Sequence, residues 1–311
     1  MKILIIGTPR APTLNVGSNG LGRHVYDFLK LFVKQGCEIT TILHPASKLE
    51  WDNVRQLHFT DEITAVHDIR KLISMDNYDV IFDCTHFKML SRHYAKDNLP
   101  IVNFILDEEC PFDPPNCLIV NSYQKQKYTT GKILHSGIIF DNYKLYEERE
   151  GYFCFAGKLE HRKGWDIALK VANKTGINIK FAGPDTSGIS NSLPNWVGEI
   201  KDHDKFCDFV GKSQGLFYPS RSDAGGIGIL EAAALGTPTI TISASGARCN
   251  VVHGKTGFIA NNMEELCESV SEIRKLNPKN VRHEASKMWD LSKNFKQIYK
   301  LLDEVRLGER W

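Results

Sequence analysis

Short apolar runs alternate with amphipathic segments along the whole chain. This alternation is typical of a parallel β-sheet whose strands are joined by crossover helices. The pattern predicts strands at residues 2–7, 38–43, 55–60, 78–83, 100–106, 117–120, 152–156, 178–182, 216–218 and 257–260. It predicts helices at residues 20–35, 63–74, 87–94, 165–174, 204–211, 227–235, 263–275 and 281–305.

The alternation is interrupted once, in the charged stretch 143–151, which has no apolar period. A chain of 311 residues is also too long for one compact core. We therefore predict two α/β domains, at residues 1–146 and 147–280. The remaining segment, 281–311, is dominated by one long amphipathic helix.

Composition excludes several classes of protein. A net charge of +2 gives no support for nucleic-acid binding. The sequence contains no run of 18 apolar residues that would span a membrane, and its first apolar run is too short for a signal peptide. The eight cysteines include no Cys-x2-Cys pair, which indicates reduced, buried thiols rather than zinc ligands or disulfides. These features predict a cytoplasmic protein.

The stretch 215–238 combines a strand, a glycine-rich turn and the start of a helix. The strand ends at Pro219, and the glycines that follow open a helix that Gly236 ends. A glycine turn at this position leaves backbone N–H groups free at the positive end of the helix dipole, where they most often bind phosphate. We predict that the backbone of Gly226, Ile227 and Gly228 holds a diphosphate.

Two acidic residues flank this turn. Asp223 precedes the glycines, and Glu231 shares a helix face with Ile227 and Gly228. An acid beside an anion site is explained if it binds hydroxyl groups, because it would repel the phosphate itself. The alternative is a purely structural turn, with Asp223 as a helix cap and Glu231 on a solvated face.

The Asp-x7-Glu spacing resembles the Glu-x7-Glu motif of retaining GT-B glycosyltransferases of family 4, the glycosyl transferases group 1. The string LFYPSRSDAGGIGILEAAALGTPTI is similar to the family signature along its whole length. The resemblance implies two doubly wound Rossmann-like domains that face each other across a cleft. The N-terminal domain would lie on the acceptor side, the C-terminal domain would bind the nucleotide sugar, and the segment 281–311 would cross back. Asp223 stands where the family carries Glu, and its side chain is shorter by one methylene group.

The same resemblance assigns further residues to the diphosphate. Lys158 and Lys163 follow a predicted strand in FAGKLEHRKGWD, where the family carries Arg and then Lys. Two cations there would stabilise the charge that grows on the leaving phosphate, although solvated surface lysines are the alternative. Gly20 and Gly22 open a predicted helix without the Gly-x-Gly-x-x-Gly fingerprint. In the family this loop faces the donor diphosphate.

Other candidates lie at predicted strand ends and loops. His86 ends a strand at the edge where α/β sheets bind ligands, and it is either an acceptor-side residue or a packed histidine. The acids at 107–109 either orient an acceptor or are solvated. Asn250 stands where the family carries Glu, and we assign it no role beyond backbone contacts. Asp202-His-Asp204 resembles a metal motif of another glycosyltransferase fold, but a helix N-cap is the preferred interpretation.

The expected activity is retaining transfer of a hexose-type sugar from a nucleoside-diphosphate sugar to a hydroxyl acceptor of a glycan, a lipid or a small molecule. The expected donor carries UDP rather than GDP, and no metal or other cofactor is required. The resemblance implies front-face attack without an enzyme nucleophile. The alternatives are a UDP-sugar 2-epimerase and a weakly active sugar-nucleotide-binding protein. The basic segment 87–96 is either a peripheral membrane contact or a solvated helix.

Overall fold

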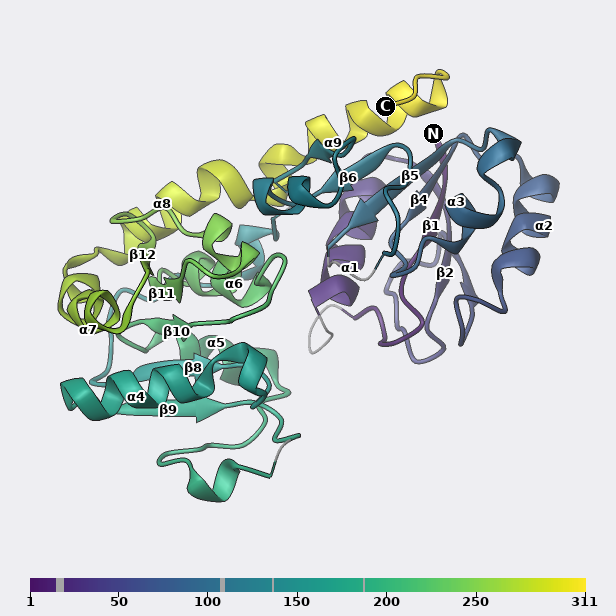
Figure 1. The fold of residues 1–311 in the computed structure, drawn as a ribbon. Coiled ribbons are helices and arrows are strands. Elements are labelled where there is room, and N and C mark those ends of the chain that lie inside the picture. Colours follow the sequence, from purple (N-terminus) through teal and green to yellow (C-terminus); the bar gives the residue numbers. More distant parts are fainter. Residues whose placement is uncertain (15–19, 107–109, 136, 187) are drawn as a thin grey trace. The chain divides into compact units, whose positions relative to one another are not determined.

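A computed structural model describes residues 1–14, 20–106, 110–135, 137–186 and 188–311. The chain forms two compact units (Figure 1). Unit 1 comprises Met1–Ser136 and Leu291–Trp311, and unit 2 comprises Gly137–Asp290. The boundaries expected from the sequence, after residues 146 and 280, both fall inside unit 2.

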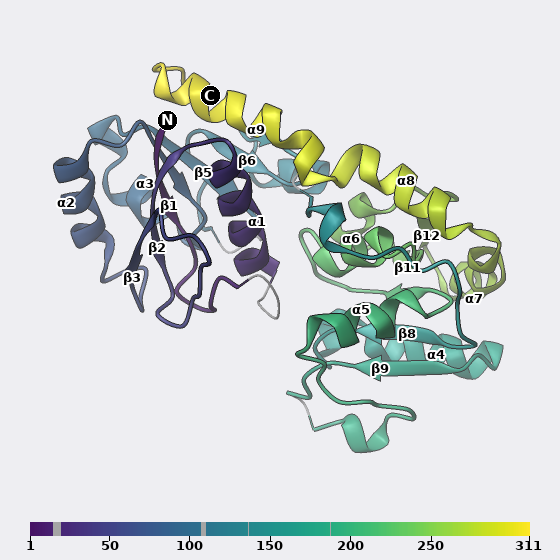
Figure 2. The same ribbon diagram turned by 180° about the vertical axis from the view of Figure 1, so that it is seen from behind.

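Unit 1 is built on a seven-stranded parallel sheet with the order β3-β2-β1-β4-β5-β6-β7. Its strands are β1 (Lys2–Ile6), β2 (Glu38–Leu43), β3 (Val54–His58), β4 (Val80–Asp83), β5 (Ile101–Ile105), β6 (Cys117–Ile119) and β7 (Lys132–Ile133). Helices α2 (Val66–Asp76) and α3 (Met89–His93) pack on one face, in a core that includes Ile6 and Ile81. Helices α1 (Gly20–Lys34) and α9 (Leu291–Arg306) cover the other face, as Figure 2 shows from behind.

The face below α1 and α9 is an aromatic core. The ring of Phe28 lies 5.1 Å from the rings of both Phe82 and Phe104, in edge-to-face geometry. Phe32 meets Phe295 of α9 at the same distance. Such pairs are favourable beyond the area that they bury, and they hold the C-terminal helix on unit 1.

Unit 2 is a five-stranded parallel sheet with the order β12-β11-β10-β8-β9. Its strands are β8 (Phe153–Ala156), β9 (Ile179–Ala182), β10 (Leu216–Tyr218), β11 (Thr239–Ile242) and β12 (Gly257–Ala260). Helices α4 (Trp165–Thr175) and α7 (Met263–Glu272) cover one face. Helices α5 (His203–Gly211), α6 (Ile227–Ala234) and α8 (Pro278–Trp289) cover the other. Side chains alternate along β8, since Phe153 and Phe155 join the first core and Cys154 joins the second.

The strand order of unit 2 reverses direction between β8 and β10, which are neighbours in the sheet although β9 separates them in the sequence. Doubly wound sheets bind ligands outside the carboxyl ends of the strands at such a switch point. The corresponding switch point of unit 1 lies between β1 and β4. The prediction of two doubly wound α/β units is therefore confirmed.

The prediction of one helix over 281–305 is wrong, because α8 and α9 are separate helices. Asp290 between them has extended backbone (ψ 106°) and forms a parallel bridge with Ile138. The Ile138 N–H donates to the carbonyl of Trp289 (3.1 Å). A Cβ on Gly137 would lie 1.5 Å from that carbonyl oxygen, so only glycine permits the approach. The amphipathic pattern continues through Asp290 and does not reveal this break.

The remaining elements are short 3-10 helices at Ala95–Asp97, Ser122–Gln126, Phe140–Asn142, His161–Lys163, Ser190–Ser192, Gly246–Asn250 and Ile273–Lys275. All eight cysteines are free thiols in the structure, and six of them are buried. Among the described helices, none is both long and apolar enough to cross a membrane.

Candidate functional site

Two loops leave the carboxyl ends of β8 and β10 at the switch point of unit 2, and they are joined to each other. Residues 157–164 follow β8, and residues 219–226 follow β10. The Arg221 N–H donates to the carbonyl of Arg162 (2.8 Å). The Arg221 guanidinium also binds both carboxylate oxygens of Asp166 at the start of α4 (2.7 and 2.8 Å). This paired contact fixes the second loop to the helix that follows the first.

Asp223 lies at the centre of this junction. Its Oδ2 accepts hydrogen bonds from Lys163 Nζ and from the Tyr218 hydroxyl (2.7 Å), and its Oδ1 accepts one from the Gly226 N–H (3.1 Å). The side chains of Lys163 and Asp223 are 18% and 14% exposed, so this ion pair is only partly screened by water. The Asp223 carboxylate therefore contacts three elements: loop 157–164, strand β10 and the start of helix α6.

The protonation states of the junction follow from these contacts. Burial acts to raise the pKa of Asp223, but the Lys163 ammonium and the hydrogen bonds from Tyr218 and Gly226 outweigh it, and the pKa lies below its usual value. Burial and the neighbouring Asp223 carboxylate raise the pKa of Tyr218 well above its usual range. At neutral pH the site thus holds a carboxylate and a neutral phenol that donates to it.

Helix α6 begins in the geometry of an anion site. Gly226, the N-cap, has a left-handed backbone (φ 60°) and no side chain of its own, and its N–H donates to Asp223 Oδ1. Ile227 and Gly228 form the first turn, so their amides point to the switch point of the sheet. Asn250 Nδ2 donates to the carbonyl of Gly225 and holds the glycine turn from the far side. The arrangement suits an anion with several oxygen atoms.

Glu231 lies one turn further along α6 and is held by a tyrosine. The Tyr143 hydroxyl donates to Glu231 Oε1 (2.9 Å). Tyr143 is 3% exposed and follows the 3-10 helix Phe140–Asn142 near the start of unit 2. Both carboxylates of the Asp-x7-Glu pair therefore accept a hydrogen bond from a tyrosine hydroxyl.

Lys158 is placed differently from Lys163. Its side chain is exposed, and within the described part of the chain it forms no ion pair or hydrogen bond. The structure thus brings Lys163, Asp223, Gly226 and Glu231 to one end of the unit 2 sheet. A role for Lys158 remains a prediction.

Gly20, Gly22 and His86 belong to unit 1. Gly20 and Gly22 begin α1, which follows β1, and His86 follows the neighbouring strand β4. All three lie at the carboxyl edge of that sheet, and their functional roles remain predictions. His86 is 8% exposed, and its backbone N–H donates to Glu62 Oε2 (3.1 Å). The predicted acceptor-side acids at 107–109 lie outside the described residues.

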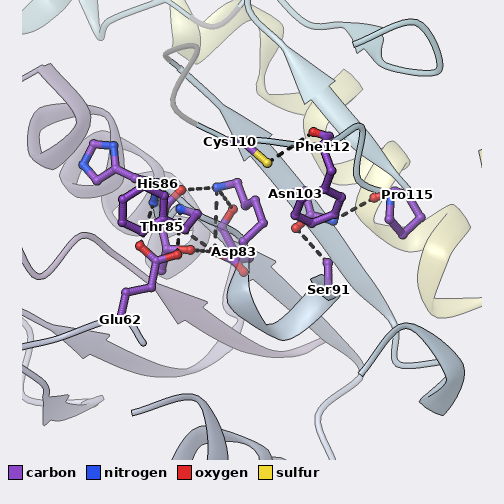
Figure 3. A network of polar contacts seen from close by, with 11 residues as sticks. Glu62, Asp83, Thr85, His86, Ser91, Asn103, Cys110, Phe112 and Pro115 are labelled. Carbon is purple, nitrogen blue, oxygen red and sulfur yellow. Dashed lines mark hydrogen bonds and ion pairs between the residues drawn. The ribbon is translucent and has the colours of Figure 1, made fainter. Parts of the chain in front are cut away.

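The loop after β4 contains a buried polar network (Figure 3). Glu62 Oε1 accepts from the Phe87 N–H (2.7 Å), and Asp83 Oδ1 accepts from the Thr85 hydroxyl (2.6 Å). Lys88, only 1% exposed, donates to the carbonyls of Asp83 (3.0 Å) and Thr85. Because these bonds satisfy the loop backbone, the network fixes the shape of this edge of unit 1.

The Glu62 carboxyl makes stability depend on pH. Its burial, and next the nearby Asp83 carboxylate, raise the pKa of Glu62 above the usual value of 4.5. A raised carboxyl pKa stabilises the fold fully below the unfolded pKa, and the contribution is lost as pH rises through the folded value. We expect the unfolding free energy of the wild type, relative to Glu62→Gln, to fall between pH 4.5 and pH 7. Urea unfolding at both pH values measures it, and a difference that rises with pH would contradict the assignment.

The predicted helix cap at Asp202 is confirmed, since Asp202 Oδ1 accepts from the Lys205 N–H (2.9 Å) at the start of α5. The described residues contain no group of three or more His, Cys, Asp or Glu side chains that could hold a metal ion.

Comparisons with known proteins agree with this geometry. Residues 140–288, nearly all of unit 2, match the family model described as glycosyl transferases group 1. The chain carries a group 1 glycosyltransferase domain. This match includes Asp223, Gly226 and Glu231, and it supports a glycosyltransferase activity.

The relatives of this chain are distant in sequence. An uncharacterized glycosyltransferase of Methanocaldococcus jannaschii is 28% identical over an alignment of 141 positions, which covers 42% of this chain and 40% of that protein. The aligned parts span 60% or less of the curated relatives. AviGT4, a glycosyltransferase involved in avilamycin A biosynthesis, is 15% identical with a TM-score of 0.77, and the match covers 100% of this chain and 99% of AviGT4. HepE from Anabaena, solved with UDP-glucose, is 15% identical with a TM-score of 0.74, covering 98% and 100% of the two chains. These structures share the fold.

Sequence reasoning missed four residues that shape the site: Tyr143, Asp166, Tyr218 and Arg221. Only Tyr218 carried a local signal, because a tyrosine that ends a buried strand needs a partner for its hydroxyl. The sequence predicts no role for Asn250 beyond backbone contacts, whereas in the structure its side chain donates to the Gly225 carbonyl.

Proposed function

We propose that the protein is a retaining glycosyltransferase that moves a hexose-type sugar from a nucleoside-diphosphate sugar to a hydroxyl acceptor. One observation carries the proposal: the Lys163 ammonium is held at the N-terminus of α6, on the switch point of the unit 2 sheet. A fixed cation and free helix amides together bind a diphosphate and stabilise the charge that grows on it as the sugar leaves. Lys158 would add a second cation, and no divalent ion is then required.

The remaining roles follow from the chemistry of each group. Glu231 accepts hydrogen bonds from the ribose, and Asp223 lies on the side of the transferred sugar. We assign Gly20 and Gly22 to the donor diphosphate and His86 to the acceptor side. The acceptor is a glycan, a lipid or a small molecule, with UDP favoured over GDP in the donor. That HepE was solved with UDP-glucose supports the choice of donor class.

A screen of nucleotides for thermal stabilisation tests the donor class. We expect UDP, UDP-sugars or both to raise the Tm of the wild type by several degrees, since a ligand at 100 times its Kd adds about 2.7 kcal/mol. AMP and inorganic phosphate should have little effect, because each lacks part of the nucleoside-diphosphate pattern. A protein that no nucleoside diphosphate stabilises would contradict the proposal.

Incubation of the protein with UDP-N-acetylglucosamine and no acceptor distinguishes the epimerase alternative from a glycosyltransferase. Formation of an isomer would identify a 2-epimerase, whereas transfer that depends on an added hydroxyl acceptor identifies a glycosyltransferase. Tight UDP binding without turnover on any acceptor would indicate a binding protein.

A further inference from the structure

Tyr143 connects the beginning of unit 2 with the helix that carries Glu231. It lies 88 residues before Glu231 in the sequence, yet its hydroxyl donates to Glu231 Oε1 at 2.9 Å. Glu231 is partly exposed at the site, whereas Tyr143 is buried. A free glutamate side chain on a helix surface samples several rotamers, so a hydrogen bond from a buried donor restricts its carboxylate to few of them.

The position of Tyr143 is itself fixed by several elements. Arg282 of α8 donates to the carbonyl of Tyr143 (2.7 Å) and to the carbonyl of Ala234 (2.5 Å), which is the last residue of α6. The ring packs edge-on against His203 of α5, with centroids 5.3 Å apart. Tyr143 is thus connected to α6 at two points. Its hydroxyl binds Glu231 directly, and Arg282 links its carbonyl to the carbonyl at the end of the helix.

The chemistry of the bond leaves Glu231 able to bind a ligand. A carboxylate offers about four acceptor positions, and the tyrosine hydroxyl takes one of them. A phenol donor also adds no charge, so it orients the carboxylate without competing as a cation would. An oriented carboxylate binds a pair of neighbouring hydroxyl groups with less loss of side-chain entropy than a mobile one.

We propose that Tyr143 is a positioning residue that aims the Glu231 carboxylate at the ribose hydroxyls of the donor. The inference rests on the proposed function, in which Glu231 accepts hydrogen bonds from the ribose. It assigns Tyr143 to the recognition of the nucleoside and not to the diphosphate, which Lys163 and the α6 amides hold.

The test compares two ligands, UDP and 2′,3′-dideoxy-UDP, which lacks both ribose hydroxyls. We expect Tyr143→Phe to weaken UDP binding about tenfold, as for loss of a hydrogen bond to a charged group. Binding of the dideoxy analogue, measured by calorimetry, should stay within about twofold of the wild type. Tyr152→Phe is the matched control, since Tyr152 is 4% exposed and its hydroxyl donates to the Phe209 carbonyl (2.8 Å).

A double-mutant cycle shows whether Tyr143 acts through Glu231. If it does, Tyr143→Phe has no further effect on UDP binding once Glu231 is replaced by Ala, which removes the acceptor. Equal weakening of the binding of both ligands, or an equal loss of UDP binding in the Glu231→Ala background, would mean a merely structural role and overturn the inference. Unchanged UDP binding in Tyr143→Phe overturns the inference alone, while a wild type that binds no nucleoside diphosphate overturns the proposed function together with it.

Discussion

Lys163→Ala is expected to lower the rate of sugar transfer by about 10²-fold or more, the loss typical for one donor to a developing oxyanion. Lys163 is the cation that the structure holds beside the N-terminus of α6, where the charge of the leaving diphosphate would develop. The substitution also leaves the Asp223 carboxylate without its cation near the anion site, and this repulsion should weaken donor binding. Steady-state kinetics with the donor found in the nucleotide screen measure both effects.

Two further variants distinguish the loss of the Lys163 cation from the effect of the unpaired Asp223 carboxylate. Lys163→Ala combined with Asp223→Asn removes the unpaired carboxylate, so donor binding should partly recover while transfer stays slow. Lys158→Ala removes an exposed lysine and should cost less than Lys163→Ala. Transfer at the wild-type rate in Lys163→Ala would refute the role of this residue, and equal losses in both single variants would show that Lys158 reaches the diphosphate as well.

Gly164→Ala is expected to destabilise unit 2 by several kcal/mol and to reduce donor binding, because the residue lies between the two loops of the site. Its backbone is left-handed (φ +77°), and a Cβ would lie 2.0 Å from the carbonyl oxygen of Pro219. Relief of this overlap must separate the loop of Lys163 from the loop of Asp223. Urea unfolding and calorimetry with UDP measure the two consequences.

Gly176→Ala is the matched control at the other end of α4. Gly176 has nearly the same backbone (φ +70°), but no atom lies within 4 Å of a Cβ placed there. Only the left-handed strain remains, which costs about 1–2 kcal/mol, and the site loops are untouched. If both alanine variants lose the same unfolding free energy and bind UDP equally well, close packing of the two loops contributes neither to stability nor to donor binding.

Much of the site could be predicted because its parts are local. The strand at 216–218, the glycine turn and the helix from Ile227 occupy the predicted positions, since a turn that opens a helix depends on residues a few places apart. The spacing of Asp223 and Glu231 on one helix start is local too. The break between α8 and α9 is not local, because Ile138 and Gly137, far away in the sequence, hold Asp290 in an extended conformation.

The partners of the two carboxylates show the same division. Lys163 lies 60 residues from Asp223, and Tyr143 lies 88 residues from Glu231. No period or motif connects positions at such separations. The contact between Lys163 and Asp223 exists because β8 and β10 are neighbours in the sheet while β9 lies at its edge.

The amino-acid sequence alone determines that this protein alternates strands and helices, that a glycine turn opens a helix, and that two acids flank the turn. Those features arise from backbone preferences and side-chain periods within a few residues. Folding of unit 2 adds the pairing of Asp223 with Lys163 and Tyr218, and of Glu231 with Tyr143. These contacts depend on strand order and helix packing, which bring distant residues together and which no local pattern encodes.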